Sequence, residues 1–429
     1  MTLRPAEGEL GIGDRVVVAV GPIAHGGHCV ARHDGRVLFV RHALPGEEVV
    51  AEVTEGKPGD RFLRADAVEI VRPSPDRVVP PCSYAGPGRC GGCDFQHVGV
   101  SAQRELKAAV VREQFAHLAR LAVDPVVEEL PGHPDGLGWR TRIEYAVGPG
   151  GEAGLRPHRS HEVIPIAECL IADQRIQDAD VLQRDWSGQS SVDVVAPSAS
   201  RPVVVPVPSG VGREPVVQES VAAGGFAHTF EVSARGFWQV HPAAAATFVA
   251  VVLGMLDPQP GDRCLDLYAG VGLFAAALAD AVTPLGQVIA VESDRQATFH
   301  AKANLTAYRH ALVVPGRVDD LFGVARPKRR GSADRGQRPR KLRRSPLLPE
   351  RADLVVLDPP RTGAGAGVVG AVAGLQPRAI AYVACDPAAL ARDTATFAEH
   401  GYTMTRLRCF DAFPMTHHVE CIARFEPTA

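Results

Sequence analysis

The chain has 429 residues, of which 45% are hydrophobic and 22% are charged, and its formal net charge is −3. This composition is that of an ordinary globular protein with room for more than one core, and it indicates no nucleic-acid partner unless basic residues gather locally. The first ten residues lack the apolar core of a signal peptide, and no apolar run could span a membrane. We therefore expect a cytoplasmic protein whose nine cysteines are not structural disulfides.

Residues from about 11 to 71 are predicted to form a small β-barrel. The β-branched runs "RVVVAV", "RVLFVRHA" and "EEVVAEVTE" are separated by turns rich in Gly, Pro and Asp. Several short strands at this spacing are typical of a barrel. The Pro-rich stretch "VRPSPDRVVPP" then marks a break, so we assign residues 1–72 to a first domain.

The central segment, residues 73–236, is predicted to be rich in β-structure. It contains one helical period, "SAQRELKAAVVREQFAHLARL", and strand patterns return from Trp139 to about Val232, mixed with Pro, Gly and Ser. It also holds four cysteines, which are Cys82, Cys90, Cys93 and Cys169. Four thiolates suit either zinc or an iron–sulfur cluster, but three close cysteines and one remote one do not match the two pairs of a zinc ribbon.

Residues 237–429 are predicted to form a doubly wound α/β domain. The helical stretch "HPAAAATFVAVVLGML" precedes the apolar strands "RCLDLY", "GQVIAVE", "ADLVVLD" and "AIAYVAC", which alternate with Ala-rich helices. This alternation is typical of parallel βαβ units. A basic loop, residues 326–350, interrupts the pattern and is predicted to be disordered, either as a solvated insertion or as an RNA contact.

A nucleotide site is predicted at the start of this domain. In "CLDLYAGVGLFAAALA", Gly270 and Gly272 follow a strand and precede a helix, so the backbone can approach a ligand closely. Glu292 ends the next strand, where an acid can accept hydrogen bonds from ribose hydroxyls. Together they predict an adenosine half-site, although the glycine pattern alone would also fit a nucleotide-dependent oxidoreductase.

Two later strands end in residues that favour methyl transfer over hydride transfer. "VVLDPPRTGAG" places Asp358 and two prolines at the carboxyl edge of the sheet, where ligands of such sheets bind. The next strand ends at Cys385, so its thiol is predicted to face the same crevice. By itself this cysteine could equally be a small buried hydrophobe.

These motifs together carry a resemblance to a known family. "DLYAGVGLF", "LDPPRTG", "YVACDPAALARD" and "DAFPMTHHVE" occur in the order found in the RNA uracil-5 methyltransferases, and "FWQVHP" resembles the stretch before that family's cofactor domain. The first domain resembles the TRAM domain, an OB-like RNA-binding barrel. The cysteine segment resembles the cluster-binding motif of the rRNA-modifying branch. The resemblance covers nearly the whole chain and implies a Rossmann-like domain that binds S-adenosylmethionine.

The resemblance also implies roles for individual residues. Cys385 matches the nucleophile and Glu420 matches the base. The positions expected to contact the cofactor are Gln239, Tyr268, Gly270, Gly272, Glu292, Asp319 and Asp358. The four central cysteines match ligands of a [4Fe–4S] cluster, with zinc as the alternative. Three positions depart from the family pattern, with Asp386 and Leu273 where Asn is usual and Met415 where His is frequent.

The expected function is therefore methylation of carbon 5 of a uridine in RNA, through a thiolate adduct at carbon 6. The expected substrate is 23S rRNA, with tRNA as the alternative; a non-catalytic RNA-binding iron–sulfur protein is the rival from another class. We also expect a monomer without a membrane or an obligate protein partner. The thiol needs a lowered pKa, which positive charge or the helix starting near Pro387 could provide.

Overall fold

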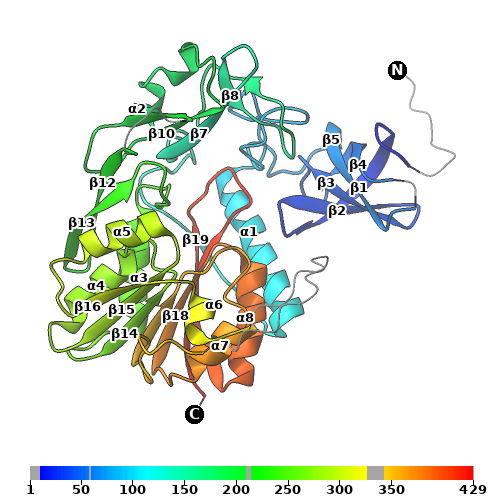
Figure 1. The fold of residues 1–429 in the computed structure, drawn as a ribbon. Helices are drawn as coiled ribbons and strands as arrows, with labels where there is room; N and C mark the ends of the chain where they lie inside the picture. The colour runs from blue at the N-terminus through cyan, green and yellow to red at the C-terminus, as the bar shows by residue number, and fades with distance from the viewer. Residues whose placement is uncertain (1–9, 58, 209–213, 326–342, 429) are drawn as a thin grey trace, which may run out of the picture.

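The computed structural model describes residues 10–57, 59–208, 214–325 and 343–428. Figure 1 shows three parts: a barrel near the N-terminus, two small sheets in the middle of the chain, and a layered α/β domain that ends at the C-terminus. Within the described residues, no helix has the length and apolarity needed to cross a membrane. The α/β fold class predicted from the sequence is confirmed.

The first part is a closed five-stranded barrel in the order β1-β2-β3-β5-β4. Its strands are β1 (Arg15–Ala24), β2 (His28–His33), β3 (Arg36–Arg41), β4 (Glu48–Glu55) and β5 (Phe62–Arg72). Buried and exposed residues alternate along β1, so that Val16, Val18 and Val20 fill the interior. The predicted barrel is confirmed, and its pattern of alternating valines explains why it closes around one core.

A helical segment then connects the barrel to the α/β domain. Its elements are α1 (Val100–Gln114), the π-helical turn η1 (Phe115–Ala119) and the short strand β6 (Val127–Glu129). Val111 and Phe115 are fully buried in the same core as strands of the α/β domain, and β6 pairs with the edge of its sheet. Thus part of the predicted central segment, 73–236, packs with the C-terminal domain, as the cyan helix beside the orange helix α8 shows in Figure 1.

The rest of the central segment is β-rich, as predicted. A five-stranded sheet has the order β11-β10-β7-β8-β9, and β12 and β13 form a separate hairpin. The elements are β7 (Arg142–Val147), β8 (Ala153–Leu155), β9 (Ile164–Pro165), α2 (Gln174–Gln177), η2 (Val181–Gln183), β10 (Ser191–Val195), β11 (Val203–Val207), β12 (Val216–Ala223) and β13 (Phe226–Ser233). Trp139 and Tyr145 are fully buried in the core of this part.

The C-terminal part is an eight-stranded sheet in the order β16-β15-β14-β17-β18-β20-β19-β6, covered by helices on both faces. Its elements are α3 (Ala244–Leu256), β14 (Arg263–Leu267), α4 (Leu273–Val282), β15 (Gln287–Glu292), α5 (Arg295–Asn304), β16 (Ala311–Pro315), α6 (Val318–Phe322), β17 (Leu354–Leu357), α7 (Ala366–Ala373), β18 (Ala379–Ala384), α8 (Pro387–Glu399), β19 (Tyr402–Asp411) and β20 (Glu420–Pro427). Strands β14 to β18 are parallel, which confirms the predicted βαβ units. Strand β20 is antiparallel to β18, and this insertion brings the end of the chain into the middle of the sheet.

The predicted basic loop lies largely outside the described residues, since 326–342 are not among them. The described remainder of that loop returns to the α/β domain: the Ser345 backbone N–H donates to the Leu321 carbonyl at 2.7 Å, and Leu348 is buried in the core.

Candidate active site

One large cleft opens at the carboxyl ends of the parallel strands. It has a volume of about 1210 Å³. The predicted site residues that line it are Gln239, Tyr268, Gly270, Glu292, Asp319, Asp358, Cys385 and Glu420. Gly272 does not line it but forms the N-cap of α4 with a φ of 91°. The parallel strands all end at this edge, which explains why residues scattered over 180 positions of sequence meet here.

The predicted adenosine half-site lies at the ends of β14 and β15. The Gly270 backbone N–H donates to Glu292 Oε2 at 2.9 Å, and the other carboxylate oxygen accepts from the Ser293 and Asp294 backbone N–H groups at 2.6 Å. A Cβ at Gly270 would meet nothing within 4 Å, so the turn is open toward the cleft. The glycine turn and a fixed carboxylate can thus bind a nucleoside.

Cys385 and Glu420 are brought together by strand pairing. In the antiparallel pair β18–β20, Ala384 lies opposite Cys421. Cys385 directly follows Ala384, and Glu420 directly precedes Cys421, so the two side chains come from adjoining strand ends, and both line the large cleft. Residues 35 positions apart in sequence therefore form one thiol–carboxyl pair at the wall of the cleft.

Acidic groups dominate the electrostatics of this wall. Burial raises the pKa of Asp266 to about 8 and that of Asp358 to about 7, and neighbouring carboxylates add to both shifts. Burial and the charge of Asp358 hold the pKa of Glu420 well above its usual range. Such a site favours a bound cation, because a positive charge would let these carboxyl groups ionise.

The thiol of Cys385 does not have the lowered pKa that we expected from the sequence. Burial, followed by the charges of Glu420 and Asp358, raises its pKa to about 11, and only Arg361 among the larger contributions opposes this. Helix α8 does begin at Pro387, as predicted. The expectation took the helix and positive charge into account but not the burial of the thiol, which is the largest cause, or the acids that the fold gathers around it.

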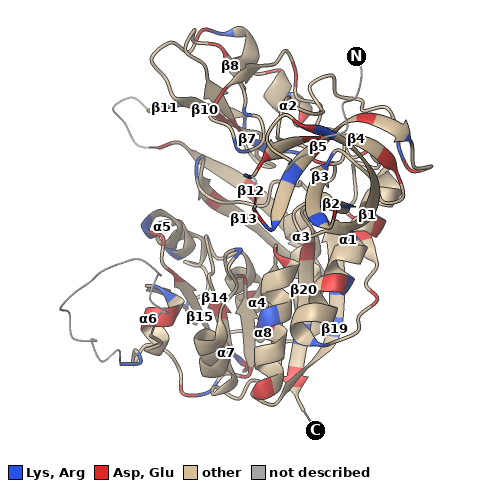
Figure 2. Cartoon of the chain, turned by 90° about the vertical axis from the view of Figure 1, so that its right-hand side faces the viewer, with Lys and Arg blue, Asp and Glu red and all other residues tan. Residues whose placement is uncertain are grey.

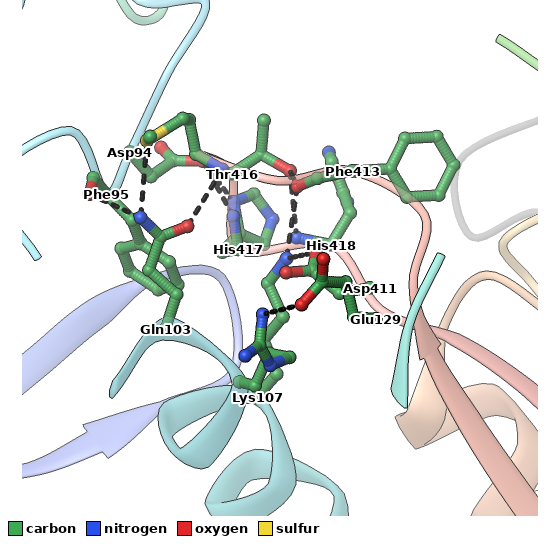
Figure 3. A network of polar contacts seen from close by, with 12 residues as sticks. Asp94, Phe95, Gln103, Lys107, Glu129, Asp411, Phe413, Thr416, His417 and His418 are labelled. Carbon is green, nitrogen blue, oxygen red and sulfur yellow. Dashed lines mark hydrogen bonds and ion pairs between the residues drawn. The ribbon is translucent and has the colours of Figure 1, made fainter. Parts of the chain in front are cut away.

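The segment between β19 and β20, which leads to Glu420, is anchored to α1 by polar groups (Figure 3). Lys107 is fully buried, and its Nζ donates to Asp411 Oδ1 at 2.5 Å and to the Phe413 carbonyl at 3.0 Å. Gln103 Nε2 donates to Met415 Sδ at 3.2 Å, and Gln103 Oε1 accepts from the Met415 backbone N–H at 2.8 Å. These contacts were not predicted from the sequence; the one local signal is that a glutamine and a lysine lie on the buried side of the helix.

Loss of the Lys107 ammonium is expected to destabilise the protein strongly. Lys107→Met would leave Asp411 buried without its counter-ion, which costs about 3–5 kcal/mol in the free energy of unfolding. The double variant Lys107→Met/Asp411→Leu should recover much of this loss, because no buried charge remains. Urea unfolding followed by tryptophan fluorescence measures both effects.

The matched control is Arg112→Ala on the same helix. Arg112 pairs with Asp124 at 2.9 Å, but both side chains are exposed, so its removal should change stability by about 1 kcal/mol or less. A Lys107→Met variant as stable as this control would contradict the role assigned to the buried pair.

A second set of polar contacts connects the cysteine segment to the segment between β19 and β20. Asp94, which follows Cys93, accepts from His417 Nδ1 at 2.6 Å and pairs with Arg41 of the barrel at 3.1 Å. Although burial acts to raise the pKa of Asp94, its bonds to His417 and the charge of Arg41 hold that pKa below its usual value. The segment before Glu420 is thus tied to α1, to the cysteine segment and to the barrel.

The four central cysteines line one small cavity, together with Arg140. The cysteines are Cys82, Cys90, Cys93 and Cys169. Burial and the neighbouring thiols raise the pKa of Cys93 to about 12, so the sulfurs lie close enough to influence one another. Across the described part of the chain, however, no set of three or more His, Cys, Asp or Glu side chains is placed to hold a single metal ion.

Comparison with known proteins identifies the family. The model of the tRNA (uracil-5-)-methyltransferase family matches residues 171–426, and that of the TRAM domain matches residues 10–68. The chain belongs to the RNA (uracil-5-)-methyltransferase family. Enzymes of this class transfer a methyl group from S-adenosylmethionine to RNA, which confirms the enzyme class expected from the sequence. The barrel is the TRAM domain.

Relatives of this methyltransferase align over almost their whole length. An uncharacterized RNA methyltransferase of Streptomyces avermitilis is 46% identical, with 97% of this chain and 99% of the relative covered. The 23S rRNA (uracil(1939)-C(5))-methyltransferase RlmD of Alkalilimnicola ehrlichii is 30% identical, with 96% of each covered. The Pyrococcus abyssi tRNA (uracil-54, C5)-methyltransferase, solved with S-adenosyl-L-homocysteine, has the same fold, with a TM-score of 0.65 over 95% of this chain and 99% of that one at 21% identity.

Proposed function

We propose that this methyltransferase modifies carbon 5 of a uridine in 23S rRNA, with Cys385 as the nucleophile and Glu420 as the base. The observation that carries the proposal is the position of Cys385 and Glu420 at adjoining strand ends, in the lining of the cleft that also contains the adenosine half-site. The preference for rRNA over tRNA rests on the RlmD relative, which aligns over nearly the whole chain.

The chemistry explains why one thiol and one carboxylate are needed. Carbon 5 of uracil is a poor nucleophile, and addition of the Cys385 thiolate at carbon 6 creates an enolate whose carbon 5 can form a bond to an electrophilic methyl group. Glu420 as carboxylate then takes the carbon 5 proton, the carbon 6–sulfur bond breaks, and the thiolate is released with the methylated base. S-adenosylmethionine, when bound, would supply the methyl group as an electrophile and leave as S-adenosylhomocysteine.

The residues of the cleft fit S-adenosylmethionine. We assign Gln239, Tyr268, Gly270, Glu292, Asp319 and Asp358 to its binding, with Gly272 shaping the turn. The open backbone at Gly270 and the fixed Glu292 carboxylate suit a nucleoside. The raised pKa of Asp358 suits a sulfonium cation, since a positive charge beside it would stabilise its ionised form and favour the thiolate of Cys385.

The RNA is proposed to lie over the barrel and the cysteine segment. A cavity of about 480 Å³ between these parts is lined by Arg41, Arg64, Arg89 and Arg159. Arg64 also lies over the ring of Phe39, so cations and an aromatic face are available together for phosphates and bases. Figure 2 shows acidic and basic residues interspersed over the barrel and α8, so the RNA contact is local and not one uniformly basic face.

The proposed function is tested by incubating the purified protein with labelled S-adenosylmethionine and either 23S rRNA or tRNA from cells that lack it. We expect 5-methyluridine at one position of the rRNA. If only the tRNA is labelled, the substrate is tRNA and not 23S rRNA. No label in either RNA would favour an RNA-binding protein without catalysis.

We further propose that Cys82, Cys90, Cys93 and Cys169 hold a [4Fe–4S] cluster. All four line one cavity, yet among the described residues no set of three or more His, Cys, Asp or Glu side chains is placed to hold a single metal ion. A zinc site would bring its sulfurs within about 3.8 Å of one another, whereas a cluster accepts ligand sulfurs that lie farther apart. Its role would be structural, because Asp94 next to Cys93 anchors the segment before Glu420.

The cluster proposal predicts iron and acid-labile sulfide in protein purified without oxygen. Cys90→Ser should remove most of the iron, whereas Cys29→Ser, in the buried core of the barrel, should retain it. Iron, sulfide and zinc assays on the two variants decide the matter. Stoichiometric zinc, or retention of iron by Cys90→Ser, would contradict the proposal.

A further inference from the structure

The turn between β1 and β2 of the barrel reaches the α/β domain beside the nucleophile. His25 Nε2 lies 3.0 Å from Asp386 Oδ2, and Asp386 directly follows Cys385 in the chain. The same side chain accepts a hydrogen bond of 2.7 Å from the Ala389 backbone N–H as the N-cap of α8. One carboxylate therefore joins the barrel, the backbone of the nucleophile and the first turn of α8.

The glycines after His25 fit against the segment that leads to Glu420. Gly27 has a φ of +80°, and a Cβ at this position would lie 2.8 Å from the Cβ of His417. Only glycine combines this backbone conformation with so close an approach. His417 precedes Glu420 by three positions, so the same turn contacts the segment of the nucleophile and the segment of the base.

Cys385 lines two cavities. Besides the large cleft, it lines a second cavity of about 110 Å³, which is also lined by His25, Gly26 and Gly27 of the barrel. Arg361 also lines both cavities. The barrel turn and the thiol thus share a cavity that Gly270 and Glu292 of the adenosine half-site do not line.

The charged groups around the Cys385 thiol determine how a cation beside Asp386 would change the pKa of that thiol. Besides the larger effects of burial, Glu420 and Asp358, the carboxylate of Asp386 also acts to raise the pKa of Cys385. The hydrogen bond to Asp386 raises the pKa of His25 and, against burial, the same bond lowers that of Asp386. The short contact thus favours the charged form of each partner; the other charged groups that affect the pKa of His25 are Arg392 and Glu113.

We propose that the β1–β2 turn completes the catalytic site, with His25 as a positioning residue that orients Asp386 and offsets its charge beside the Cys385 thiol. The consequence for methyl transfer rests on the proposed function. The effect on the reactivity of the Cys385 thiol does not, and it can be measured without RNA. The barrel then contributes to the chemical step in addition to holding RNA.

The test is the rate at which iodoacetamide alkylates Cys385 in the full-length protein over a pH series, with mass spectrometry of the peptide that contains Cys385. In His25→Ala, the uncompensated Asp386 carboxylate should raise the thiol pKa by about one unit, which slows alkylation about tenfold. His25→Ala/Asp386→Asn should restore the rate, because Asn keeps an N-cap acceptor without the charge. His33→Ala is the control, since His33 pairs with the exposed Asp34 at 3.4 Å and should leave the rate unchanged.

A pair of glycine variants tests the second contact. Gly27 and Gly35 have the same φ of +80°, but a Cβ at Gly35 would meet nothing within 4 Å. Gly27→Ala should therefore slow alkylation of Cys385, and Gly35→Ala should not. Equal effects of the two changes would mean that backbone strain is responsible and would overturn the assigned contact with His417.

An unchanged alkylation rate in His25→Ala would overturn the proposal, and so would a double variant that remains as slow as His25→Ala. Failure of the proposed function looks different: the alkylation rates would follow the expected order while the wild-type protein methylates no RNA. Binding of S-adenosylmethionine to each variant shows whether the α/β domain is folded.

Discussion

Replacing Cys385 with alanine is expected to abolish methyl transfer, with a fall in rate on the order of 10⁴- to 10⁶-fold, the scale seen when a covalent nucleophile is removed. Without the thiolate, carbon 5 of the uracil cannot gain enolate character. No other cysteine lines the large cleft, as far as the described residues show. Transfer of a labelled methyl group to RNA measures the effect, and retention of more than a few per cent of the rate would contradict the covalent route.

The matched control for this variant is Cys264→Ala. Cys264 is buried in β14 of the same sheet but does not line the cleft. Its replacement should leave methyl transfer within a few-fold of the wild-type rate. Binding of S-adenosylmethionine should survive in both variants, because the proposed half-site of Gly270 and Glu292 is unchanged.

Replacing Glu420 with glutamine is expected to stop the reaction one step later. The amide cannot accept the proton from carbon 5, so the methylated uridine should remain bonded to Cys385. Turnover should fall by about 10²- to 10⁴-fold while a protein–RNA species accumulates on denaturing gels. Absence of this species, with normal binding of RNA, would count against the role of Glu420.

The change to glutamine should preserve the structure around the site. Glu420 is buried, and glutamine has nearly the same size and shape as glutamate, so the variant should pack as the wild-type side chain does. Glu426→Gln, on the same strand but paired with Arg424 near the surface, should neither slow turnover nor accumulate the adduct. The contrast isolates the chemistry at the cleft from the packing of β20.

Much of the fold follows from local patterns in the sequence. Alternating valines predict the barrel, and apolar strands between Ala-rich helices predict the parallel sheet, because burial on one or two faces sets the period of hydrophobic residues. The insertion of β20 between β18 and β19, and the addition of β6 at the edge, were not predicted. A strand pattern indicates which face is buried but not which strand is its neighbour.

The site was predictable to the extent that its residues end strands. Asp358 and Cys385 could be placed at one edge of the sheet from the sequence, whereas the role of Glu420 came from a family resemblance. The contacts that position the site join residues far apart, such as Lys107 with Asp411 and His25 with Asp386. Pairs separated by hundreds of positions leave no local pattern.

The most direct test of the covalent route is mass spectrometry of the adduct formed by the Glu420→Gln variant, after digestion of both RNA and protein. The covalent route predicts one modified peptide, the one that contains Cys385, carrying a uridine nucleotide with one added methyl group. A nucleotide attached to any other residue, or a nucleotide on Cys385 without the methyl group, would contradict the proposed order of bond formation.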